Sequence, residues 1–147
     1  MMQRDYKITL TVNATPQESF KSINRVSKWW TDDFVGSSQN LNDEFSVRFG
    51  DVHFSKQKLI EVVQDQRIVW LVTDSKLNFI KDKDEWTNTK IRFEVSNQEG
   101  QTQIHFTHFG LIPDVECYES CVQGWDYFIK GSLFKLITQG KGTPGLE

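Results

Sequence analysis

The chain has 147 residues and a formal net charge of −3, with acidic and basic side chains spread along its length. This size predicts one domain over residues 1–147, and the charge pattern argues against a nucleic-acid surface, which usually carries a basic face or stripe. No apolar run approaches the roughly 18 residues of a membrane span, and the N-terminus lacks the apolar region of a secretory signal. We therefore expect a soluble cytoplasmic protein that does not insert into a membrane.

The first part of the chain predicts one strand and two short helices. Residues 6–12 alternate apolar and polar side chains, which is typical of a half-buried strand. A capping threonine followed by Pro16 predicts a helix over residues 16–24. Trp29 and Trp30 indicate a second helical turn. Because the two tryptophans are adjacent, we expect one of them to pack inside and the other to border an opening.

Strand-like alternation dominates from residue 43 to residue 110. Gly50 and Asp51 predict a two-residue hairpin turn, and residues 53–64 form the returning strand. Residues 74–86 are either a short extra strand or a buried loop. Consecutive hairpins of this kind predict an antiparallel sheet of which about five or six strands follow the short helices.

The most strongly patterned segment runs from Asp114 to Gly140. Its apolar side chains recur at helical spacing and form one broad face, so the segment predicts a long helix that packs on the sheet. Asp114 is the expected N-cap, and Gly140 ends the helix. Gly124 and Gly131 lie seven residues apart on one flank, where we expect a neighbouring segment to approach closely.

Cysteine and histidine are the residues that would hold a metal ion. Cys117 and Cys121 are four residues apart in the predicted helix, where parallel Cβ directions make a disulfide unfavourable, and we interpret both as small buried side chains. Together with His108 they would still lack a fourth zinc ligand. His105 and His108 point to opposite faces of a strand and cannot chelate one ion together. We therefore predict neither a metal site nor a cofactor.

Four short motifs occur in a fixed order along the chain. They are Ser27-Lys28-Trp29-Trp30-Thr31, Glu85-Trp86-Thr87-Asn88-Thr89, Thr107-His108-Phe109-Gly110-Leu111 and Gly124-Trp125. Together they resemble the helix-grip fold of the START-like (SRPBCC) superfamily, and more narrowly the C-terminal domain of the activator of the ninety-kilodalton heat-shock chaperone ATPase. The resemblance implies an α+β fold in which a curved antiparallel sheet of about six or seven strands surrounds a long C-terminal helix.

The resemblance also implies a deep, mostly apolar cavity between that helix and the sheet. The residues that we predict for its wall are Trp29, Trp30, Phe45, Val47, Phe49, Trp70, Val72, Phe93, Phe106, His108, Cys121, Trp125 and Phe128. For most of these residues a plain hydrophobic core is the competing interpretation. His108 is either a hydrogen-bonded structural group or a polar group that serves a ligand or a reaction.

These observations leave three functions open. The first is binding of a small hydrophobic or amphipathic ligand in the cavity. The second is an enzyme of the cyclase or hydrolase type, which would need a second polar group, such as Tyr118, within reach of His108. The third is a chaperone partner in the stress response, although 147 residues leave no room for the separate N-terminal domain of the family's activator. The final Leu146 and Glu147 are compatible with a cloning remnant.

Overall fold

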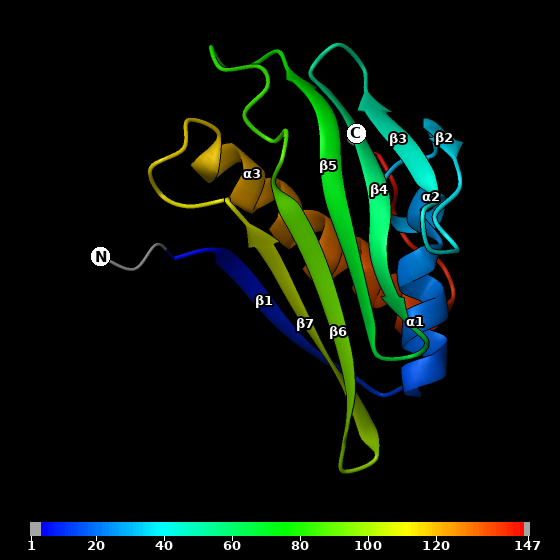
Figure 1. Cartoon of the computed structure of the whole chain (residues 1–147). Coiled ribbons are helices and arrows are strands. Elements are labelled where there is room, and N and C mark those ends of the chain that lie inside the picture. Colours follow the sequence, from blue (N-terminus) through cyan, green and yellow to red (C-terminus); the bar gives the residue numbers. More distant parts are fainter. Residues whose placement is uncertain (1–3, 146–147) are drawn as a thin grey trace.

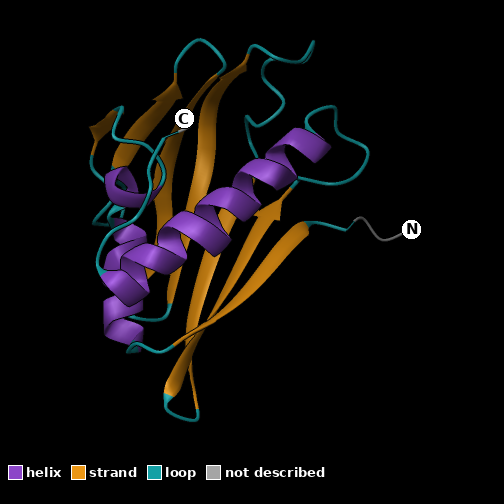
Figure 2. Ribbon diagram, turned by 180° about the vertical axis from the view of Figure 1, so that it is seen from behind, coloured by secondary structure: helices purple, strands orange, loops and turns teal. Residues whose placement is uncertain are grey.

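The computed structural model describes residues 4–145 and shows a curved antiparallel sheet that wraps around one long helix (Figures 1 and 2). The elements, in chain order, are β1 (Tyr6–Val12), α1 (Pro16–Asn24), α2 (Val26–Trp29), β2 (Phe34–Gly36), β3 (Glu44–Phe49), β4 (His53–Val63), β5 (Arg67–Leu77), β6 (Lys90–Gln98), β7 (Gln101–Phe109), α3 (Tyr118–Trp125), the π-helix η1 (Asp126–Leu133) and α4 (Phe134–Gln139). Within the described residues the sheet has seven strands in the order β1-β7-β6-β5-β4-β3-β2. The predicted α+β helix-grip fold is confirmed.

The first helix begins and ends where the sequence predicts. The Thr15 hydroxyl accepts a hydrogen bond from the backbone N–H of Glu18, and the Glu18 carboxylate accepts one from the backbone N–H of Thr15, each at 3.0 Å. This reciprocal capping box satisfies two N–H groups that the first helical turn would otherwise leave free. The following strands pair in the predicted antiparallel manner, and β1 returns to pair with β7.

Two connections differ from the prediction, and both lie at the same end of the sheet. Phe49 pairs with His53, so the β3–β4 turn contains three residues, Gly50 to Val52, instead of two. The uncertain stretch 74–86 is divided: β5 continues to Leu77, and residues 78–89 form a loop, called here the β5–β6 loop. These two connections supply part of the wall of the site described below.

The C-terminal helix crosses the concave face of the sheet (Figure 2). It starts at Tyr118, three residues later than predicted, and Asp114 does not cap it. Among the described residues no side chain caps its first turn. The Glu85 carboxylate instead accepts hydrogen bonds from the backbone N–H groups of Glu116 and Cys117, in the turn that precedes the helix, at 2.7 and 2.8 Å. The helix ends as predicted, with Gly140 in the left-handed conformation at φ 80°.

The structure contradicts the prediction that the two cysteines stay unlinked. Cys117 and Cys121 form a disulfide with a Cα–Cα distance of 5.7 Å. The prediction assumed that both residues lie inside the helix, whereas Cys117 precedes its first residue. The direction of the Cys117 side chain is therefore not held parallel to that of Cys121 by the helix.

The close neighbour expected at the two helical glycines is also absent. A Cβ atom built on Gly124 or Gly131 would meet no heavy atom within 4 Å outside the helix backbone. Both positions therefore have room for a larger side chain. None of the helices within residues 4–145 has the length and apolar character needed to cross a bilayer. Leu146 and Glu147 lie outside the described residues.

Candidate functional site

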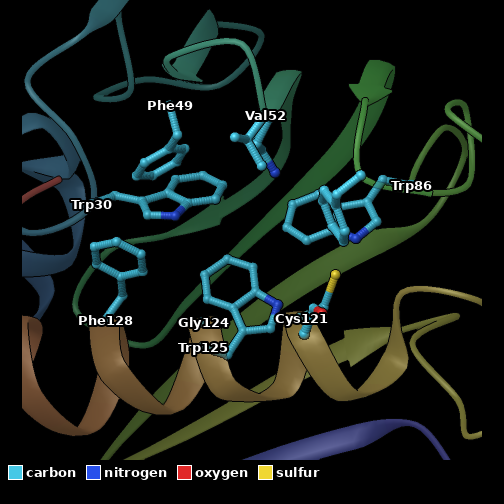
Figure 3. Close-up of a pocket in the computed structure, with 11 residues that line it drawn as sticks. Trp30, Phe49, Val52, Trp86, Cys121, Gly124, Trp125 and Phe128 are labelled. Carbon is cyan, nitrogen blue, oxygen red and sulfur yellow. The ribbon is translucent and has the colours of Figure 1, made fainter. Parts of the chain in front are cut away.

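A cavity of about 320 Å³ lies between helix α3, the start of η1 and the end of the sheet where β3 turns into β4. Its wall consists of Trp30, Phe49, Val52, His53, Phe79, Trp86, Ser120, Cys121, Gly124, Trp125 and Phe128. Figure 3 shows Trp30, Phe49 and Val52 on the sheet side, facing Trp125 and Phe128 on the helix. Val52 and Phe79 are 49% and 41% exposed, so they form the apolar rim where the pocket opens to solvent.

The structure brings five of the thirteen predicted cavity residues to this wall. They are Trp30, Phe49, Cys121, Trp125 and Phe128. The other eight are fully buried instead. The hydrophobic core contains Trp29, Phe45, Val47, Trp70, Val72, Phe93 and Phe106, and His108 is a buried polar residue. The open space therefore occupies one end of the interval between helix and sheet, and close-packed side chains occupy the rest.

Both neighbouring tryptophans are buried, with exposures of 0% for Trp29 and 2% for Trp30. As expected, Trp29 packs in the core and Trp30 borders an opening, but Trp30 does so as a buried side chain and not as an exposed one. The Trp29 indole N–H donates to the carbonyl oxygen of Ile23 at 3.1 Å, while Trp30 borders the pocket. Its ring centroid lies 5.0 Å from that of Trp125 and 6.3 Å from that of Trp86.

His108 takes part in a continuous chain of hydrogen bonds behind the pocket. The Trp125 indole N–H donates to Nδ1 of His108 at 3.0 Å, so a neutral imidazole carries its proton on Nε2. Nε2 then donates to the Thr89 hydroxyl at 2.9 Å, and that hydroxyl donates to the carbonyl oxygen of Trp86 at 2.6 Å. Burial, and to a lesser degree nearby His53, lowers the pKa of His108 to about 3, so the ring is neutral at pH 7.

His53 is the histidine that reaches the pocket wall, and the sequence did not single it out. Its Nε2 atom lies 2.9 Å from the Ser55 hydroxyl, and the rings of Trp30, Phe49 and Trp86 surround the imidazole. Burial lowers the pKa of His53 to about 4, so this side chain is also neutral at pH 7. No wall residue within the described chain is Asp, Glu, Lys or Arg.

Five further wall residues were not predicted as such, although Trp86 and Gly124 stand in the motifs named above: Val52, Phe79, Trp86, Ser120 and Gly124. Val52 and Phe79 come from connections whose course the alternation of side chains does not determine. Ser120 and Gly124 lie beside Cys121 and Trp125 on the helix, and their small size gave no apolar signal. For His53 the sequence held no usable signal, because the predicted two-residue turn pairs Phe49 with Val52, whereas the structure pairs Phe49 with His53 and so places both on one face of the sheet.

Two carboxylates hold the β5–β6 loop against the segment that precedes α3. Glu85 accepts the N–H groups of Glu116 and Cys117, as described above, and Glu116 in turn accepts the backbone N–H groups of Lys81 and Asp82 at 3.0 to 3.1 Å. We call this reciprocal arrangement the carboxylate clasp. Because the loop also carries Phe79 and Trp86, the clasp fixes one side of the pocket.

The clasp predicts a stability effect that depends on pH. Hydrogen bonds from the backbone of Lys81 and Asp82 lower the pKa of Glu116 below its ordinary value of 4.5. Ionised Glu116 therefore adds stability at neutral pH, and this contribution is lost as the pH falls from 4.5 through the lower folded-state pKa. A Glu116→Gln variant should have a lower Tm than the wild type at pH 7, and the difference should shrink below pH 4. An equal difference at both pH values would contradict the role of the charge.

Within residues 4–145, no group of three or more His, Cys, Asp or Glu side chains comes close enough to hold a metal ion. The hydrogen-bond partners of His108 are Trp125 and Thr89, and neither a carboxylate nor Tyr118 is among them. The arrangement therefore offers an apolar, aromatic pocket with a neutral imidazole, a serine hydroxyl and one sulfur of a disulfide on its wall.

Several solved structures share the fold of this protein. Solved structures with the same fold include the Aha1 dimer from Colwellia psychrerythraea, with a TM-score of 0.76 at 21% identity over 95% of this chain and 99% of that chain. Protein MLL2253 from Mesorhizobium loti has a TM-score of 0.73 at 12% identity, with coverage of 91% and 96%. Protein SSP2350 from Staphylococcus saprophyticus has a TM-score of 0.72 at 14% identity, with coverage of 97% and 98%. At these identities the likeness shows the fold alone.

The sequence itself gives the more specific result. A search of curated proteins found no significant match. The family model described as "Activator of Hsp90 ATPase homolog 1-like protein" matches residues 18–137, which is well over half of the chain. This range includes every wall residue of the pocket. The protein therefore belongs to the family of activator of Hsp90 ATPase homolog 1-like proteins, within the START-like superfamily.

Proposed function

We propose that this protein binds a small, uncharged, mostly apolar molecule in the pocket beneath the C-terminal helix. The observation that carries the proposal is an open cavity of about 320 Å³ with an aromatic wall and no acidic or basic side chain other than a neutral histidine. This volume falls at the lower end of the range of ligand pockets, about 300–1,000 Å³. The family supports a cavity of this kind without identifying a ligand.

The chemistry of the wall indicates which ligands fit. Each square ångström of apolar surface that leaves water contributes about 25 cal/mol, so an apolar ligand gains from contact with Trp30, Trp125 and Phe128. A carboxylate or ammonium group would lose its hydration without gaining a charged partner, which disfavours fatty acids and amines. His53 can make one polar contact, since no described residue is hydrogen-bonded to its Nδ1 atom.

Tryptophan fluorescence provides the test, because Trp30, Trp86 and Trp125 lie on the wall. Titration with uncharged 2-naphthol or 1-octanol should change the emission in a saturable way, whereas octanoate and octylammonium at equal concentrations should not. Perturbation of Trp86 and Trp125 indole N–H resonances in NMR spectra would locate the ligand. If neither uncharged compound saturates, or if the charged compounds bind equally well, the proposal fails.

The family description favours a second function, stimulation of a chaperone ATPase. This stays a prediction, as does an enzymatic use of the pocket. A chaperone ATPase assay with this protein added would test the first, and it differs from the ligand titration because its outcome does not require an occupied pocket.

A further inference from the structure

One sulfur of the disulfide belongs to the pocket, and the other does not. Cys121 lies on the wall, and Figure 3 shows its sulfur directed toward the Trp86 side of the pocket. Cys117 is only 1% exposed and is not a wall residue. Its backbone N–H donates a hydrogen bond to Glu85 within the carboxylate clasp. A molecule in the pocket therefore meets the disulfide at Cys121 first.

We propose that the Cys117–Cys121 disulfide is a thiol-exchange site for small uncharged thiols that enter through the pocket, with Cys121 as the residue attacked. The inference shares with the proposed function the requirement that small molecules enter this pocket. It adds a covalent chemistry that reversible binding does not need.

The exchange is balanced in atoms and electrons. The thiolate of the entering thiol attacks Sγ of Cys121, a new S–S bond forms, and the Cys117–Cys121 bond breaks. The electron pair leaves on Sγ of Cys117, which takes up the proton that the entering thiol released. A second thiolate attacks the entering sulfur of the mixed disulfide and frees Cys121, which is protonated in the same way. Two thiols are thereby oxidised to one small disulfide, and the protein disulfide is reduced to two thiols.

The pocket wall predicts the selectivity of this reaction. The charge of the attacking thiolate is common to all thiols, so the selectivity lies in the rest of the molecule. An aromatic ring can pack against Trp125 and Phe128, whereas a second charged group would lose hydration beside a wall without charged partners. Entry also requires the space next to Gly124, which lies one helical turn after Cys121 and has no heavy atom within 4 Å of an added Cβ. A larger residue at this position should therefore hinder the reaction.

The test compares benzyl mercaptan with anionic 2-sulfanylethanesulfonate on the oxidised protein. Acid quenching, alkylation of free thiols and peptide mass spectrometry give the rate of disulfide loss and the cysteine that carries the adduct. The two rates are compared at equal thiolate concentration and are corrected for the effect of each thiol's pKa on its nucleophilicity. Benzyl mercaptan should then react at least about tenfold faster than the anionic thiol, and the adduct should be on Cys121. The Gly124→Leu variant should remove this preference, and Gly131→Leu, away from the pocket wall, should retain it.

Each other outcome overturns the inference. Equal rates for the two thiols, an adduct on Cys117, or an unchanged preference in Gly124→Leu would mean that exchange occurs by opening of the fold and not through the pocket. If Cys117 and Cys121 remain free thiols in the purified protein and do not form a disulfide, the proposed exchange site does not exist. The readout is covalent and independent of fluorescence, so an unsuccessful ligand titration combined with a preserved thiol preference would reject the proposed function and leave this inference standing.

Discussion

Acidification from about pH 6.5 to about pH 4.5 should lower the free energy of unfolding by up to about 5 kcal/mol, because the buried His108 and the half-buried His53 resist protonation. Burial lowers the pKa of His108 to about 3 and that of His53 to about 4 from the ordinary value of 6.5. In this window the unfolded chain binds protons that the folded chain excludes. Each histidine then costs about 1.4 kcal/mol of stability per pH unit, and the contribution is fully present only above pH 6.5.

The origin of this effect is geometric. His108 accepts a hydrogen bond from Trp125 at Nδ1, and protonation of that nitrogen would place two N–H groups against each other in a buried site. A His108→Asn variant keeps an acceptor for the indole N–H but does not titrate. It should lose about half of the pH dependence, His53→Asn about the other half, and the double variant nearly all of it.

Urea unfolding at a series of pH values measures these slopes, and NMR titration of the imidazole resonances measures the two pKa values directly. The comparison relies on slopes, so a general loss of stability in a variant does not obscure it. A His108 resonance that titrates near pH 6.5 in the folded protein, or a double variant with the wild-type slope, would contradict the prediction.

The second large effect is expected from Gly124→Leu, which should weaken ligand binding strongly and leave the fold intact. A leucine side chain at this position extends from the pocket wall into open space, since an added Cβ meets nothing within 4 Å. The leucine takes up space that the ligand needs, so the binding free energy should become less favourable by about 1–3 kcal/mol. This corresponds to a Kd that is raised roughly 5- to 150-fold. Leucine also has a higher helix propensity than glycine, so the stability of the protein should not fall.

Gly131→Leu is the matched control. It lies on the same helix, has the same open surroundings and is absent from the pocket wall. Fluorescence titration with 2-naphthol should give a Kd close to that of the wild type for Gly131→Leu and a raised Kd for Gly124→Leu. Thermal unfolding of both variants verifies that they are folded. If both variants bind equally well, the ligand does not occupy this pocket.

Side-chain periodicity alone predicted much of the fold, because each pattern is local. Helix α1 depends on the threonine–proline pair and on Glu18 three residues after the cap, all within one turn, and its bounds were predicted correctly. The alternating residues of β1 and β3 likewise indicated which side chains face the core. The broad apolar face of the last helix required a sheet to pack on, and the sheet is present.

The turn that precedes the last helix is held by a residue far away in sequence. Glu85 lies about thirty residues before Tyr118, and its carboxylate accepts the N–H groups of Glu116 and Cys117 in this turn, where local spacing placed the first turn of a helix capped by Asp114. With the start moved, Cys117 leaves the helix and can pair with Cys121. No local rule could yield either result, since both depend on how the β5–β6 loop reaches the helix.

The sequence by itself thus determined the order of elements, the antiparallel sheet and the aromatic residues of the interior. Only the tertiary structure decided where that interior is filled and where it is open. Periodicity shows which face of a strand or helix is buried. It does not show whether the side chains of the helix and those of the sheet fill the space between them. The contacts of Trp29, Trp70 and Phe93 fill one end, while Gly124 and the two connections that carry Val52 and Phe79 leave the other end open.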